Sequence, residues 1–209
     1  EEPIYVGIVV ALACAAMMIF LDSWLVPFVF LANIGMAIVV NLGTNYFFGE
    51  ISYITKALAA VLQLAVTMDY SIFLWNEYNE QRAKHDDRLE AMACAIRETL
   101  TSVIGSSMTT VAGFIALCFM SFLLGRDLGV VMAKGVLLGV VSCVTVLPAL
   151  ILLLDKPLQK TKHRSLIPDM GRFARWIIKA FPVFLVIFAL LVWPAWNGYS
   201  RTQSEVYYD

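Results

Sequence analysis

The chain has 209 residues, of which 60% are hydrophobic and only 15% charged, with a mean hydropathy of +0.78 and a formal net charge of −1. These values lie outside the range of soluble globular domains and nearly exclude a soluble enzyme. The four cysteines show neither the spacing of a metal site nor the placement of an extracytoplasmic disulfide, so we expect reduced cysteines, no metal and no cofactor.

Six apolar segments are long enough to cross a membrane, which requires about 20 mostly apolar residues in a helix. The first five predict a transmembrane core over residues 1–154. In chain order the six spans are residues 3–21, 24–42, 57–75, 100–124, 128–154 and 176–196. The fold class is therefore an all-α polytopic membrane protein with six transmembrane helices.

The connections between these spans indicate which helices are neighbours. Only Asp22 and Ser23 separate the first two spans, and Gly125–Asp127 separate the fourth and fifth, so each pair forms an antiparallel hairpin. Residues 87–98 follow a capping-box pattern, in which Asp87 precedes a helix and Glu90 lies three residues later. This pattern predicts a short amphipathic helix at the cytoplasmic interface, acting either as a coupling element or as a plain connector.

Basic residues determine the expected orientation, because cytoplasmic loops of membrane proteins are enriched in Lys and Arg. Eleven of them fall in or beside the loops 76–99 and 155–175, and three fall on the opposite side. We therefore expect both loops to be cytoplasmic, the second as a basic linker, and both ends of the chain to lie outside. Lys134 is the one basic residue inside a span, either as a counter-charge to Asp69 or with its ammonium group extended outward.

Asp69 is the main candidate for chemistry, because it lies within the third span, six residues from Trp75. At 1.5 Å per residue this is about 9 Å along the helix axis. A carboxylate within the bilayer costs roughly 2.5–3.5 kcal/mol on insertion scales. An apolar medium favours the protonated carboxyl, which makes Asp69 a candidate proton carrier. We expect spans four or five to shield it from lipid, and a hydrogen-bonded structural tie is the alternative.

Other polar and small residues form stripes on neighbouring spans. Gln63, Thr67 and Tyr70 share one face of the third span, and the fourth span carries hydroxyl groups and a glycine along one face. We expect the two stripes to face each other and to support Asp69, although such faces also serve as ordinary helix contacts. The fourth and fifth spans contribute hydroxyl residues and glycines expected to act in support or in helix packing: Ser102, Ser106, Thr109, Thr110, Gly113, Gly135, Gly139 and Ser142.

Several of these residues belong to motifs that resemble one family. The run Thr67–Leu74 resembles the Asp-Tyr helix of the resistance-nodulation-division (RND) superfamily, specifically its MMPL branch. Further matches follow in order along nearly the whole chain: Glu77–Glu80, Glu90-Ala91, Met108–Phe114, Leu128-Gly129, Met132-Ala133, Gly135 and Leu147–Leu150.

The resemblance implies a proton-driven exporter of lipids or other hydrophobic molecules in the bacterial cytoplasmic (inner) membrane. This chain is similar to helices two to seven of twelve, so that 176–209 would hold the first helix of the second half and the start of an extracytoplasmic segment. Asp69 and Tyr70 would then form half of a proton relay. The implied partners are protons, membrane lipid, a hydrophobic substrate, the remainder of the transporter and a second copy of it, with no nucleic acid.

Other function classes compete with this one. Sterol-sensing-domain proteins share the five-helix core, and some of them are regulatory scaffolds rather than transporters. The protein-translocation branch of the superfamily has Asp-Ala-Asn where this chain has Asp69-Tyr70-Ser71. An intramembrane aspartyl protease is excluded, because it needs two membrane carboxylates and only Asp69 lies within a predicted span.

Overall fold

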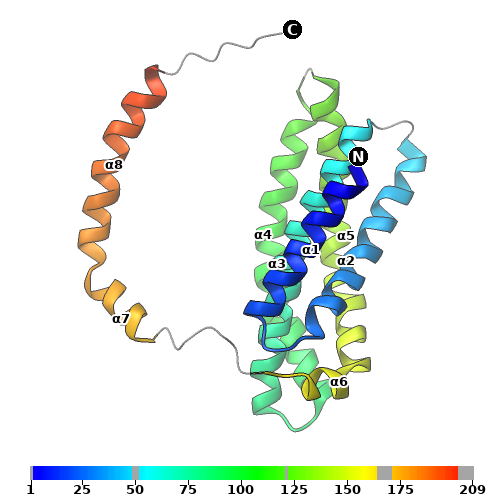
Figure 1. The fold of residues 1–209 in the computed structure, drawn as a ribbon. Helices are drawn as coiled ribbons and strands as arrows, with labels where there is room; N and C mark the ends of the chain where they lie inside the picture. The colour runs from blue at the N-terminus through cyan, green and yellow to red at the C-terminus, as the bar shows by residue number, and fades with distance from the viewer. Residues whose placement is uncertain (1, 49–51, 121, 164–170, 202–209) are drawn as a thin grey trace. The chain divides into compact units, whose positions relative to one another are not determined.

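The computed structural model describes residues 2–48, 52–120, 122–163 and 171–201, and these are helical apart from short connections and one isolated β-bridge. The chain divides into two compact units, residues 1–165 and 166–209. Among the described residues, five helices are long and apolar enough to cross a membrane, which confirms an all-α polytopic membrane protein. Figure 1 shows the order of the helices.

The first unit begins with helices α1 (Glu2–Phe20) and α2 (Val26–Thr44). Pro27 lies in the first turn of α2, where its missing N–H group leaves no hydrogen bond unmade. A short 3-10 helix, η1 (Asn45–Phe48), extends α2. The predicted second span is displaced from α2 by only two residues. Helix α1 has 19 residues, and its fully described part, Gly7–Phe20, is an apolar helix.

Helices α3 (Tyr53–Lys84) and α4 (Arg88–Leu117) form a long hairpin. The side chain of Asp87 accepts a hydrogen bond from the Leu89 amide at 3.1 Å, which confirms Asp87 as the N-cap of α4. The prediction of a separate interfacial helix at 87–98 is wrong, because these residues are the first turns of α4. Neither Gly nor Pro occurs between residues 98 and 104, so nothing ends the helix there.

The turn between α4 and α5 (Leu123–Leu153) lies earlier than the sequence suggested. The predicted loop Gly125–Asp127 is wrong, since these residues belong to the first turns of α5. The turn itself contains the apolar residues Phe119 and Phe122, which are 86% and 65% exposed. Hydropathy could not distinguish such a turn from the end of a span. The short helix α6 (Asp155–Lys160) follows α5 directly.

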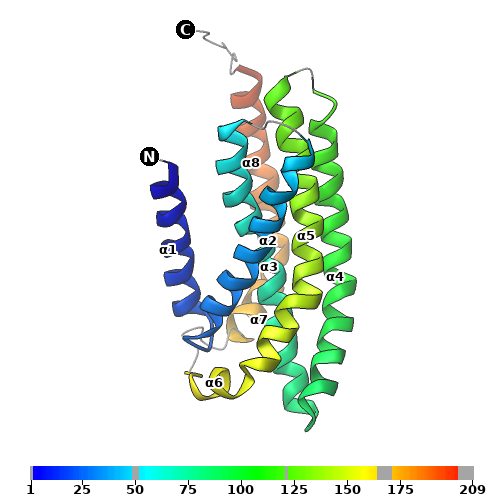
Figure 2. The ribbon, with the colours of Figure 1, turned by 90° about the vertical axis from the view of Figure 1, so that its right-hand side faces the viewer.

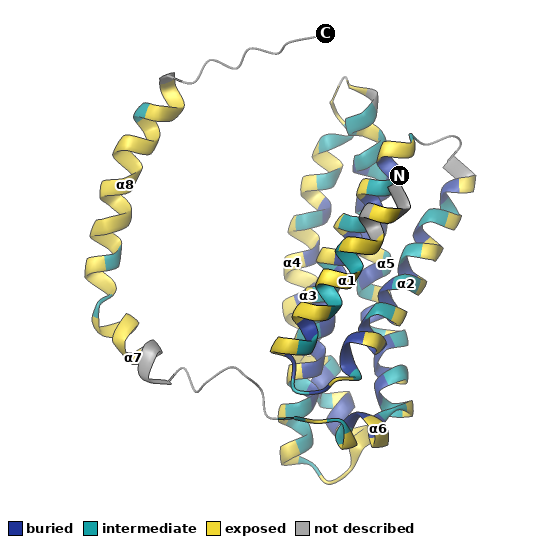
Figure 3. Ribbon diagram, in the orientation of Figure 1, coloured by how far each residue is buried: buried dark blue, intermediate teal, exposed yellow. Residues whose placement is uncertain are grey.

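The core of the first unit lies between α2, α3 and α5, with α4 packed against α3 and α5 and with α1 against α2 and α3. Figure 2 gives a second view of this bundle. Buried residues line the inner sides of α2, α3 and α5, whereas much of α4 is exposed (Figure 3). Only 17% of the apolar window of α4 is buried, against 39% for α3. The largest side chains of this core with no exposed surface include Phe30, Ile34, Leu74, Leu147 and Ile151.

The connections of the first unit gather at two ends. The turn 21–25, the turn 85–87 and the segment 154–163 lie at one end, which we call the basic end because the basic loops of the sequence start there. The C-terminal ends of α2 and α4 and the N-terminal ends of α3 and α5 lie at the opposite end. This alternation follows from helices that each cross the bundle once.

The second unit contains helices α7 (Gly171–Lys179) and α8 (Phe181–Arg201), and Ala180 separates them. Pro182 lies in the first turn of α8 and has no amide hydrogen, so the ladder of α7 cannot continue through it. The sixth predicted span therefore started too early, at residue 176. The predicted linker 155–175 includes α6 and the start of α7, and residues 164–170 and 202–209 lie outside the described residues.

Candidate functional site

The polar residues of α3 divide between two environments. Gln63, Thr67 and Tyr70 are buried, whereas the neighbouring Asp69 is exposed. Tyr70 is 4% exposed. Consecutive residues of a helix point about 100° apart, which explains why Asp69 and Tyr70 differ. The two residues predicted as a relay pair therefore lie at the edge of the helix contact, one inside and one outside.

The prediction that α4 or α5 shields Asp69 is wrong within this chain. The face of α3 that contains Thr67 and Tyr70 is buried in the bundle. Asp69 lies beside that face and is exposed. A carboxylate that faces hydrocarbon costs several kcal/mol. Asp69 is thus an energetically costly residue on the membrane-crossing surface of the first unit.

Gln63 connects three helices through its amide. The Asn41 Nδ2 of α2 donates to Gln63 Oε1 at 2.8 Å, and Gln63 Nε2 donates to the Gly135 carbonyl of α5 at 3.3 Å. A Cβ atom on Gly135 would lie 2.6 Å from Asn41 Nδ2, and one on Gly139 would lie 2.6 Å from Thr67 Oγ1. Glycine at both positions therefore allows α5 to approach α2 and α3 closely.

These contacts correct the expected arrangement of the stripes. Gln63 and Thr67 face α2 and α5, where Asn41, Gly135 and Gly139 lie, and not the hydroxyl face of α4. The prediction that the two stripes face each other is wrong for both residues. The reason is steric. Gly135 and Gly139 of α5 have no side chains, so Gln63 and Thr67 can pack against α5 at these two positions.

Lys134 binds the end of a helix. Its Nζ donates to the Asn41 carbonyl at 3.0 Å and also to Asn45 Oδ1. Both acceptors lie at the C-terminal end of α2, where the helix dipole favours a cation. The ammonium group thus acts in the cap of α2 and explains how a charge is tolerated within a span.

Most hydroxyl groups of α4 bond to carbonyls of their own helix. Ser106 Oγ donates to Val103, and Thr109 and Thr110 both donate to the Ser106 carbonyl, at 2.7 and 3.0 Å. Ser106 and Thr109 are exposed. A Cβ atom on Gly113 would meet nothing within 4 Å among the described residues. The packing role of Gly113 and the supporting role of these hydroxyls toward Asp69 stay predictions.

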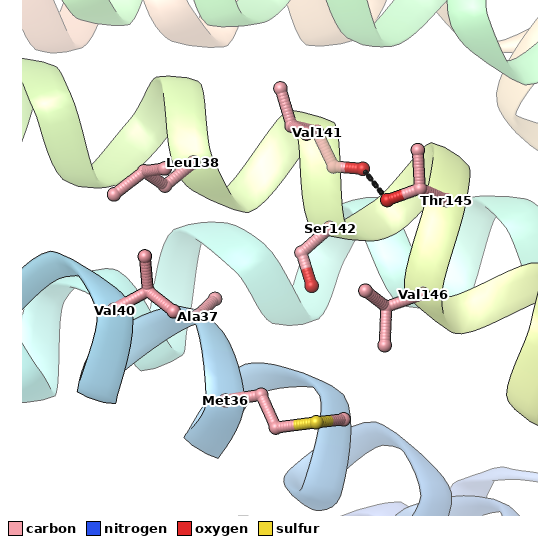
Figure 4. Close-up of a pocket in the computed structure, with 8 residues that line it drawn as sticks. All are labelled: Met36, Ala37, Val40, Leu138, Val141, Ser142, Thr145 and Val146. Atoms are coloured by element: carbon pink, nitrogen blue, oxygen red, sulfur yellow. Dashed lines mark hydrogen bonds between the residues drawn. The ribbon is translucent and has the colours of Figure 1, made fainter.

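A groove of about 160 Å³ lies between α2 and α5 and has mostly apolar walls. Figure 4 shows Ala37 and Val40 of α2 opposite Leu138 and Ser142 of α5. The Ser142 hydroxyl donates to Asn33 Oδ1 of α2 at 2.6 Å, which gives the two helices a second buried polar contact. None of the predicted relay residues lines this groove.

Sequence reasoning missed the amide residues of α2 that make these contacts. Asn33 and Asn41 of α2, and Asn45 at the C-cap of that helix, are all buried and are spaced by multiples of four. Their signal was present, because an amide within an apolar span is as unusual as a hydroxyl.

Comparison with known proteins places the chain among membrane proteins. The sequence model of the MMPL family matches residues 3–183. A putative membrane protein of Streptomyces coelicolor, ActII-3, is 30% identical over 64% of this chain and 19% of its own length. The probable transport protein MmpL9 of Mycobacterium tuberculosis is 28% identical over 80% of this chain and 18% of its own length.

A third relative carries a more specific name. The siderophore exporter MmpL5 of Mycobacterium tuberculosis is 33% identical over 54% of this chain and 12% of its own length. The chain thus spans about a fifth or less of the relatives it matches here.

Proposed function

Because this chain belongs to the MMPL family, we propose that it is part of the membrane domain of an exporter of lipids or other hydrophobic molecules, driven by protons. The chain is a multi-pass membrane protein, and relatives are named as transport proteins or exporters. The proposal extends to the bacterial cytoplasmic membrane, with the basic end inside the cell. The basic residues of loops 76–99 and 155–175 support this orientation.

One observation carries the mechanism, namely the exposed Asp69 on a membrane-crossing helix. A carboxylate in this position needs either a proton or a polar neighbour. The rest of a longer transporter would supply that neighbour by covering Asp69 and the adjacent polar face of α4. Small and hydroxyl residues on that face are suited to close helix contact. At Gly113, a Cβ atom would meet no other atom within 4 Å among the described residues.

In this proposal Asp69 carries the coupling proton and Tyr70 is a nearby donor. Ionised Asp69 attracts donors, among them the phenol of Tyr70 and the hydroxyls of Ser106, Thr109 and Thr110. Protonated Asp69 tolerates apolar neighbours at lower cost. The two protonation states would therefore favour two arrangements of α3 against its neighbours, which is what a gradient needs in order to drive a transport cycle.

The test is Asp69→Asn in the full-length protein, reconstituted in vesicles with an imposed pH gradient. Asparagine keeps the volume and the hydrogen-bonding capacity but cannot titrate, so we expect normal insertion and loss of gradient-driven export of a hydrophobic fluorescent dye. Tyr70→Phe should reduce the rate less, because it removes one donor and no charge.

Asp127→Asn is the matched control, since Asp127 lies in the first turns of α5, beyond the apolar part of that helix. Its export rate should equal that of the wild type. Export by Asp69→Asn at the wild-type rate would contradict the relay. Asp69 would then be a hydrogen-bonded structural tie, whereas a wild-type protein that exports no dye under the gradient would favour a regulatory scaffold of the sterol-sensing type.

A further inference from the structure

Asp22, in the turn between α1 and α2, binds donors from two other parts of the first unit. Trp75 Nε1 of α3 donates to Asp22 Oδ1 at 2.8 Å, and Asn79 Nδ2 of α3 donates to Asp22 Oδ2 at 3.5 Å. Lys162, beyond α6, places its Nζ 3.9 Å from the same Oδ2. One carboxylate therefore contacts both α3 and the segment that follows α6.

The neighbouring Ser23 adds contacts to the same segment. Its hydroxyl lies 2.8 Å from Thr161 Oγ1 and donates to the Leu158 carbonyl at 3.3 Å. Ser23 and Lys162 form the isolated β-bridge, and the amide of His163 donates to the Asp22 carbonyl at 2.8 Å. Main-chain and side-chain bonds thus hold the turn and this segment together.

The end of α3 also binds the segment directly. The Tyr78 hydroxyl donates to Asp155 Oδ1 at 2.9 Å, a buried contact, and Lys162 Nζ donates to Asn79 Oδ1 at 2.9 Å. The ammonium of Lys162 lies 5.9 Å from the ring centre of Trp75. Trp75 and Tyr78 have no exposed surface, so α3 presents a fixed, fully packed surface here.

We propose that these contacts form a tie that fastens the α1–α2 turn and residues 155–163 to the end of α3, so that all three move as one body. Hydrogen bonds to a carboxylate are stronger than those between neutral groups, and Asp22 accepts them from α3. Connecting segments at a membrane surface are usually more mobile than the helices they join. Residues 155–163 lead toward the second unit, so the tie would pass a shift of α3 into the chain that follows.

This inference concerns a part of α3 well away from Asp69. Trp75 lies six residues beyond Asp69 and Asn79 ten residues beyond it, both toward the basic end. Hydrogen exchange and disulfide mapping test the tie without a transport assay, so their results do not depend on the proposed proton relay. Only its consequence for transport rests on the proposed function.

The first experiment is hydrogen exchange on the full-length protein in detergent micelles. Asp22→Ala removes the acceptor of Trp75 and Asn79, and we expect exchange of residues 155–163 and of the last turns of α3 to accelerate together, by about tenfold. Asp86→Ala is the control, because Asp86 is exposed at the same end and Arg82 donates to its main-chain carbonyl rather than to its carboxylate.

Faster exchange in Asp22→Ala that is confined to residues 21–23 would overturn the tie, as would equal effects of Asp22→Ala and Asp86→Ala. A second measurement covers the case in which Asp22→Ala does not fold. The double variant Ser23→Cys with Thr161→Cys keeps Asp22 and places two thiols where hydroxyls now lie 2.8 Å apart. Peptide mapping should find a disulfide between positions 23 and 161 after mild oxidation, and its absence would contradict the proposal.

Discussion

Helices α3 and α4 both cross the membrane with several polar side chains, but they use them differently. On α3, Gln63 is buried and bonds to two other helices. On α4, Ser106 and Thr109 are exposed and bond to carbonyls of their own helix. Polar residues in a span therefore indicate either an internal contact or a surface, and the sequence pattern alone does not distinguish the two.

The most severe test of this comparison uses Gly129 of α5, which packs against α4, and Gly113 of α4 itself. A Cβ atom on Gly129 would lie 2.6 Å from the Phe114 carbonyl of α4, whereas one on Gly113 would meet nothing within 4 Å. Gly129→Ala should destabilise the protein by about 1–3 kcal/mol, because backbone must move. In the chain 1–209, which lacks the rest of the proposed transporter, Gly113→Ala should be neutral or slightly stabilising to folding. Thermal unfolding in detergent measures both, and equal losses would show that both faces of α4 are packed.

A smaller effect is expected for a polar side chain on each helix. Gln63→Leu keeps the volume but removes bonds to α2 and α5, so we expect a loss of about 1–2 kcal/mol in stability. Thr109→Val should change stability by less than about 0.5 kcal/mol, because its bond is local and exposed. Denaturant titration in mixed micelles compares the two variants. A larger loss for Thr109→Val would reverse the assignment of inner and outer faces.

The smallest effect concerns Thr67, whose hydroxyl is buried with no hydrogen-bond partner among the described residues. Thr67→Val removes this unpaired group at nearly constant volume, so stability should stay equal or rise by up to about 1 kcal/mol. The same unfolding assay measures it. A clear loss of stability would mean that the hydroxyl has a partner, and α3 would then hold one more internal polar contact than the structure gives.

Much of the fold followed from hydropathy, because a span of about 20 apolar residues has few other structures open to it. The errors lie where hydropathy carries no signal. Hydropathy predicts helix for the apolar turn with Phe119 and Phe122, and the capping pattern at Asp87 predicts a separate helix where the structure has the start of α4. The break between α7 and α8 at Ala180 depends on Pro182, which lacks an amide hydrogen and so removes one backbone hydrogen bond of the helix locally.

The candidate site was less predictable than the fold. The buried state of Tyr70 and the close approach at Gly135 and Gly139 agree with the sequence pattern. Periodicity does not predict the exposure of Asp69. Its side chain points about 100° away from that of Tyr70, and the crossing angle of the helices decides whether a side chain in that direction is covered or exposed. The cap of α2 by Lys134 required knowing which helix end lies beside it.

The α3–α4 hairpin also offers a practical handle. Helix α3 has 32 residues and α4 has 30, which at 1.5 Å per residue makes each about 45 Å or longer, against roughly 30 Å of hydrocarbon. The excess lies at the basic end, where Arg82 donates to the carbonyls of His85 and Asp86 and holds a short turn. A small rigid protein fused into this turn would stand clear of the detergent belt, and so could serve as an alignment marker for electron microscopy.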